Sequence, residues 1–104
     1  MPKPFVRVKL DKERNIRFTI KALMELEEHY SKPYHQFDPA NWGLNDIVYL
    51  LWLGLKHEDP GLTLDDVVRL VDEVESLDYV FEKVAEAYGA AFVGKKAMKS
   101  AASS

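Results

Sequence analysis

The chain has 104 residues, of which 47% are hydrophobic and 30% charged, and its formal net charge at pH 7 is −3. These values are typical of one folded domain with a modest core, and they argue against a wholly disordered or membrane-embedded chain. The lack of cysteine excludes disulfide frameworks, thiolate metal sites and cysteine nucleophiles. The longest apolar run, residues 47–53, is far shorter than the roughly 20 residues that cross a bilayer. The start of the chain has no long apolar stretch after its basic residues, so we expect no signal peptide. We therefore expect a cytoplasmic protein that does not bind membranes.

The charges are unevenly distributed along the chain. Residues 1–21 contain seven basic and two acidic side chains, residues 22–92 contain four basic and fifteen acidic ones, and the last residues add three lysines. A basic end beside an acidic body can bind nucleic acid, make contacts within one fold, or join copies of the chain through complementary surfaces. Both regions can equally be ordinary solvated surface.

Alternating apolar and polar residues predict a β-hairpin at the start of the chain. The alternation runs from Phe5 to Leu10 and again from Ile16 to Ile20, with residues 11–15 as the connecting loop. A two-stranded hairpin needs helices to cover its apolar face, and its edge either pairs with a partner's strand or is capped by those helices. The polar face provides the first candidate partner-binding residues, Arg7, Lys9 and Arg17.

Helical periodicity of the apolar residues predicts four helices after the hairpin. The first runs from Ile20 to Tyr30 and the second from Leu44 to His57, and the last two are capped by Thr63 and Ser76. The second helix is apolar on almost every side, so either the fold encloses it or one face contacts another subunit or a partner helix. The last two helices are expected to pack as an antiparallel helical hairpin, because their connection is short.

These elements predict an α+β domain over residues 1–93. It consists of an N-terminal two-stranded antiparallel hairpin followed by about four mostly amphipathic helices. Residues 94–104 are small and polar, so we expect a disordered C-terminal tail.

The loop over residues 31–43 is the longest, and it is rich in aromatic residues. Such residues can anchor a binding partner, or they can fold back to seal a small core. The aromatic candidates for partner binding are Tyr34, Phe37 and Trp42 in this loop, and Tyr49 and Trp52 on the second helix.

The sequence contains no motif typical of catalysis or of metal binding. Its three histidines, His29, His35 and His57, lack the helical spacing that directs two ligands at one metal, and no glycine-rich phosphate loop or GxSxG motif is present. The basic hairpin face has no aromatic residues to stack on bases, and the acidic body would repel a nucleic-acid backbone. We expect a non-catalytic protein with no metal, cofactor or nucleic acid.

The order of the segments carries a resemblance to a known family. A basic hairpin leads into RFTIKALMELEE, followed by an apolar helix ending LLWLGLKHEDPG, then LTLDDVVRLVDEV and a last amphipathic helix. Over roughly Phe5 to Phe92, this order resembles the tail assembly chaperones of long-tailed bacteriophages. The resemblance implies a protein of the host cytoplasm, absent from the mature virion, that binds the tape measure protein, keeps it soluble and helps recruit tail tube protein. Association with copies of itself would fit the same role.

Two further points accompany the resemblance. Many of these phage chaperones have a longer form made by ribosomal frameshifting, and residues 94–96, GKK, can be encoded by a run of adenines. The resemblance therefore implies that this chain is the short, unshifted form, encoded by a phage or prophage. The alternative left open by the residues is a small cytoplasmic regulatory or adaptor protein that binds one host partner.

Overall fold

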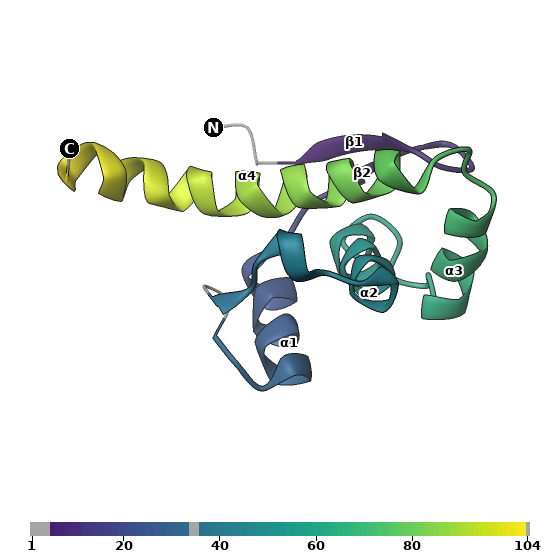
Figure 1. Ribbon diagram of the computed structural model, residues 1–104, viewed down its shortest axis with the longest axis horizontal. Coiled ribbons are helices and arrows are strands. Elements are labelled where there is room, and N and C mark those ends of the chain that lie inside the picture. Colours follow the sequence, from purple (N-terminus) through teal and green to yellow (C-terminus); the bar gives the residue numbers. More distant parts are fainter. Residues whose placement is uncertain (1–4, 34–35, 104) are drawn as a thin grey trace.

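The protein has the expected α+β architecture, a two-stranded antiparallel hairpin followed by four helices (Figure 1). The computed structural model describes residues 5–33 and 36–103, and for residues 92–103 it describes the backbone alone. The elements in chain order are β1 (Val6–Lys9), β2 (Glu13–Ile16), α1 (Ile20–Tyr30), the 3₁₀ turn η2 (Pro39–Asn41), α2 (Leu44–Leu55), α3 (Leu64–Asp72) and α4 (Leu77–Ser103).

The hairpin buries one face against α2 and α4. Its register pairs Val6 with Ile16 and Val8 with Arg14, so the buried face carries these four side chains. The prediction that the second strand covers residues 16–20 was wrong, because β2 ends where that segment begins. Past Ile16 the chain turns away from β1, since the Arg17 amide donates to the carbonyl of Gly54 at 2.9 Å and Thr19 caps α1.

The first helix begins and ends where the periodicity predicts. The Thr19 side chain accepts a hydrogen bond from the Ala22 amide, and Ser31 ends the helix in the left-handed region with a φ of 55°. Its buried stripe is narrower than expected, because Ile20 and Met24 remain 55% and 62% exposed.

The second helix lies at the centre of the fold, packed against α1, α3, α4 and β2. Leu50, Leu51 and Leu53 are fully buried, whereas Tyr49 and Trp52 are only partly buried. The fold therefore encloses most of this apolar helix and leaves one side accessible beside α1.

The caps of the last two helices are confirmed. The Thr63 hydroxyl accepts from the Asp66 amide while the Asp66 carboxylate accepts from the Thr63 amide, and Ser76 accepts from the Tyr79 amide at 3.3 Å. The expected antiparallel pairing of α3 with α4 was wrong. Helix α3 packs on α2 through Val67 and Val71, and it stands at a steep angle to α4 (Figure 1).

The last helix continues past the end predicted for it. The backbone of α4 is helical to Ser103, although the sequence favours a disordered tail from Gly94. Residues 94–103 contain no proline and several alanine and lysine residues, which are strong helix formers once a helix has started. Disorder of residues 94–104 in solution stays a prediction.

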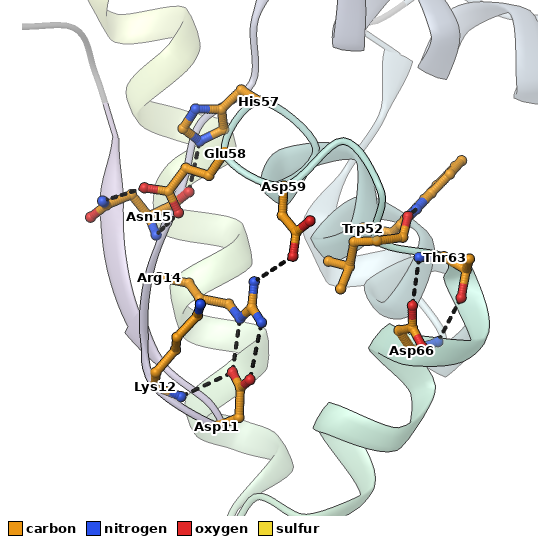
Figure 2. Close-up of polar contacts among 11 residues, drawn as sticks. Asp11, Lys12, Arg14, Asn15, Trp52, His57, Glu58, Asp59, Thr63 and Asp66 are labelled. Atoms are coloured by element: carbon orange, nitrogen blue, oxygen red, sulfur yellow. Dashed lines mark hydrogen bonds and ion pairs between the residues drawn. The ribbon is translucent and has the colours of Figure 1, made fainter.

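A polar clamp formed by Asp11, Arg14 and Asp59 ties the hairpin to the turn that follows α2 (Figure 2). Arg14 is buried, and its guanidinium binds both carboxylate oxygens of Asp11, with Nε to Oδ1 at 2.8 Å and Nη2 to Oδ2 at 3.0 Å. Its Nη1 reaches Asp59 Oδ2 at 3.4 Å. Because a buried cation needs such partners, the turn must lie against the hairpin.

The same turn covers the outer edge of β2. Both the amide N–H and the side-chain amide of Asn15 donate to the Glu58 carboxylate, at 2.9 and 2.6 Å, and His57 Nε2 lies 2.8 Å from the Asn15 carbonyl (Figure 2). These hydrogen bonds occupy the N–H and C=O of Asn15, which face away from β1.

Candidate binding surface

Five rings form a continuous aromatic strip across α1, the loop before η2 and α2. Centroid distances along the strip are 5.1 Å from Phe37 to Tyr30, 6.1 Å from Tyr30 to Tyr49, and 5.7 Å from Tyr49 to Trp52. His29 stacks on Tyr49 at 4.0 Å with only 19° between the ring planes. We call His29, Tyr30, Phe37, Tyr49 and Trp52 the aromatic strip.

Helix geometry explains why these rings meet. His29 and Tyr30 lie in the last turn of α1, and Tyr49 and Trp52, three positions apart, share one side of α2. Since α1 packs against α2, the end of α1 brings its two rings onto that side. The loop then returns Phe37 against Tyr30.

Hydrogen bonds hold two of the rings in place. Trp52 Nε1 donates to the carbonyl of Leu62 at 2.8 Å, and the Tyr30 hydroxyl donates to Asp46. Burial raises the pKa of Tyr30, and the hydrogen bond to Asp46 and its charge raise it further. Burial also raises the pKa of Tyr49, together with the negative charges of Glu25 and Glu28. Both hydroxyls therefore remain protonated in neutral solution.

Charged side chains form the rim of the strip. Lys56 Nζ lies 4.4 Å from the centroid of the Trp52 ring and binds Glu25 at 3.0 Å, and Lys32 Nζ lies 5.1 Å from the Phe37 centroid. Partly buried rings surrounded by a polar rim are typical of protein-binding surfaces.

Three of the five aromatic residues singled out in the sequence, Phe37, Tyr49 and Trp52, lie together in the strip. Trp42 does not, because its ring packs at 6.2 Å from Phe81 and 5.3 Å from Tyr88, in a second cluster beside the core. Tyr34 lies outside the described residues.

His29 and Tyr30 are the strip residues that the sequence does not single out. The helical pattern places Tyr30 in the core stripe of α1 and His29 on its polar side, so neither position stands out. The one available signal was the pair of adjacent rings at the end of a helix, directly before an aromatic-rich loop.

The basic candidates form a separate surface. Arg7 and Lys9 lie on the solvent-facing side of the hairpin, where Arg7 is 3.5 Å from Glu13. Arg17 is partly buried just after β2, and its amide binds Gly54. Gly54 lies on a different side of α2 from Tyr49 and Trp52, because a helix turns by 100° per residue. The basic residues of the hairpin and the aromatic strip are therefore two separate candidate surfaces.

The described residues contain no group of three or more histidine, aspartate or glutamate side chains placed to hold a metal ion. His57 and Glu58 bind Asn15, and His35 lies outside the described residues. Among the helices described, none combines the length and the apolar character needed to span a membrane.

Comparison of the chain with known proteins finds no matching family model, no significantly similar curated protein and no significantly similar solved structure. The function is therefore inferred from the chain's own residues.

Proposed function

We propose that this protein is a non-catalytic tail assembly chaperone of a long-tailed phage or prophage. It binds the tape measure protein through the aromatic strip, keeps that protein soluble, and helps recruit tail tube protein in the host cytoplasm. The order of the segments supports the choice of family, and the observation that carries the binding role is the continuous run of rings along α1, the loop before η2 and α2, in which His29 is exposed and the others are partly buried.

The physical basis is a match between the strip and an amphipathic helix. A tape measure protein is a very long, largely helical chain, and its exposed apolar stripes would associate with one another unless a partner covered them. Rigid aromatic rings bury a large area at a low cost in side-chain entropy, so they are favoured anchors for such a helix. The charged rim of Glu25, Lys32 and Lys56 would then fix its orientation.

The experiment is co-expression of the tape measure protein from the same genome with this chain or with variants. With the wild-type chain, we expect the tape measure protein in the supernatant after centrifugation and captured with the tagged chaperone. Tyr49→Ala should weaken capture roughly tenfold, because it removes the central ring of the strip. Val68→Ala is the matched control, since Val68 is 48% exposed on α3, outside the strip.

Two results would contradict the proposal: equal solubility of the tape measure protein without the chain, or equal capture by both variants. Capture of a single host protein in place of any tail protein would favour the adaptor alternative.

A further inference from the structure

The outer edge of β1 has free backbone groups. In the hairpin register, Val6 and Val8 direct their backbone groups to β2, so the N–H and C=O of Arg7 point away from it. Within the described part of the chain, no residue pairs with these two groups. They are therefore available to another strand.

The other edge of the hairpin is blocked at Asn15 and just past β2, because Glu58 and His57 bind the Asn15 backbone and the Gly54 carbonyl accepts from the Arg17 amide. Tyr79 closes the far end of the β1 edge, because its hydroxyl accepts a hydrogen bond from the Lys9 amide at 2.9 Å. The open edge thus begins at Phe5, whose side chain is 47% exposed, and ends before Lys9.

Charge selects the occupant of this edge. The side chains of Arg7 and Lys9 point to solvent, and Arg7 is 64% exposed despite its contact with Glu13. A strand added beside them would place alternate residues next to these two cations. Past Lys9 lies an open pocket of about 590 Å³ whose wall combines the apolar Leu10, Val74 and Tyr79 with the acidic Glu73 and Glu75, so the acidic residues of the added strand belong beside Arg7 and Lys9 and not in this pocket.

We propose that the β1 edge binds an extended acidic segment of a partner protein by strand addition. Its backbone pairs with Arg7, and its acidic side chains lie beside Arg7 and Lys9. This binding mode is independent of the aromatic strip, and it assigns the basic hairpin face a protein partner.

A second copy of the chain fits the same edge poorly. Antiparallel pairing of two β1 edges about a twofold axis centres on Arg7, the outward-facing position of the open edge, because Tyr79 occupies the Lys9 amide. Arg7 would then lie directly opposite its counterpart, and like charges in opposed positions destabilise a sheet. An acidic strand replaces this repulsion with attraction.

The test uses the full-length chain and a short synthetic peptide in which glutamate alternates with valine, with a lysine-for-glutamate peptide as its counterpart. Amide hydrogen exchange of the wild-type chain, followed by NMR, should show slower exchange at Arg7 when the acidic peptide is added. The lysine peptide should produce no such change.

Two substitutions at one position separate backbone pairing from charge. Arg7→Gln removes the charge and keeps the N–H group. Arg7→Pro removes both, while the hydrogen bonds of β1 to β2 through Val6 and Val8 remain. We expect Arg7→Pro to bind the acidic peptide about tenfold more weakly than Arg7→Gln does.

Circular dichroism checks that the Arg7→Pro variant keeps its fold. If the variant unfolds, the exchange rate of the Arg7 amide in the wild-type chain, with and without the acidic peptide, tests the proposal. Equal binding by the two variants, equal binding of the two peptides, or unchanged exchange at Arg7 would overturn the proposal. The proposal would also be overturned if sedimentation showed a dimer and the Arg7 amide of that dimer were protected from exchange without any peptide.

Discussion

At the scale of single residues, Arg14 is the buried charge that links the hairpin to the turn after α2. The hydrogen bond between Arg14 and Asp11 lowers the pKa of Asp11. The same bond raises the pKa of Arg14, because it outweighs the effect of burial. The guanidinium fork fits a carboxylate in a way that a lysine cannot reproduce. The sequence does not reveal this role, because Asp59 lies 45 positions from Arg14 and the pattern places Arg14 in an exposed loop.

We predict that Arg14→Ala lowers the free energy of unfolding by about 2 to 3 kcal/mol. This loss is smaller than the loss expected for a fully buried ion pair, because Asp11 and Asp59 are partly exposed. Urea denaturation followed by circular dichroism measures the change. Arg7→Ala is the control, and it should change stability by less than about 0.5 kcal/mol, since the Arg7–Glu13 pair is exposed. Equal effects of the two substitutions would show that the clamp contributes little.

At the scale of elements, the helices were predictable and the second strand was not. Helix α1, the start of α2 and the two caps at Thr63 and Ser76 follow from local rules that act within one or two turns. Strand β2 depends on contacts with Gly54 and Glu58, which are distant in sequence. The alternation from Ile16 to Ile20 was therefore misleading, since Phe18 is buried after the strand has ended.

The candidate site likewise has a part that follows from local spacing and a part that depends on how distant elements pack. The three-residue spacing of Tyr49 and Trp52 predicts that they share a side of α2, and they do. Which rings lie opposite them depends on how α1 crosses α2, so the adjacent rings at the end of α1 hint at His29 but do not place it on Tyr49. Trp42 was separated from the strip by the path of the loop through η2, which directs its ring towards Phe81.

Two glycines in helices provide a prediction about packing. A Cβ added at Gly54 in α2 would lie 2.5 Å from Cγ2 of the buried Ile16, whereas at Gly89 in α4 it would meet nothing within 4 Å. Gly54→Ala should therefore destabilise the protein by about 1 to 3 kcal/mol through overpacking. Gly89→Ala should stabilise it by up to about 1 kcal/mol through helix propensity.

Thermal unfolding of the two variants beside the wild-type chain checks this prediction, with opposite shifts of Tm expected. An increase in Tm for Gly54→Ala, like the one expected for Gly89→Ala, would show that Ile16 of β2 does not lie as close to Gly54 of α2 as described.

At the scale of the whole molecule, the fold places a basic hairpin on an acidic helical body and joins the two by carboxylates. From the turn after α2, Asp59 binds Arg14 and Glu58 binds Asn15, while Asp11, within the hairpin, holds the Arg14 guanidinium in place. Burial disfavours the charged form of Glu58, but the hydrogen bonds from Asn15 outweigh it, so the pKa of Glu58 is lowered. The attachment of the hairpin therefore depends on ionised carboxylates.

This dependence predicts loss of stability in acid. Because folding lowers the pKa values of Asp11 and Glu58 below their ordinary values of 3.8 and 4.5, the folded state binds fewer protons than the unfolded state as the pH falls through this range. Their contribution is complete above the ordinary values and is lost as the pH falls below about 4.5 through the lowered ones. The urea midpoint should therefore be nearly constant from about pH 7 to 5 and then fall.

The double variant Asp11→Asn, Glu58→Gln should be less stable than the wild-type chain near neutral pH, because the neutral amides cannot make the charge-assisted bonds. Its urea midpoint should also fall less steeply in acid, since two of the carboxylates responsible for the fall are gone. Glu86→Gln is the matched control, as Glu86 is exposed on α4, and it should follow the wild-type curve. If the double variant kept the full acid dependence, other carboxylates would control the pH response, and the hairpin would be held mainly by its apolar face.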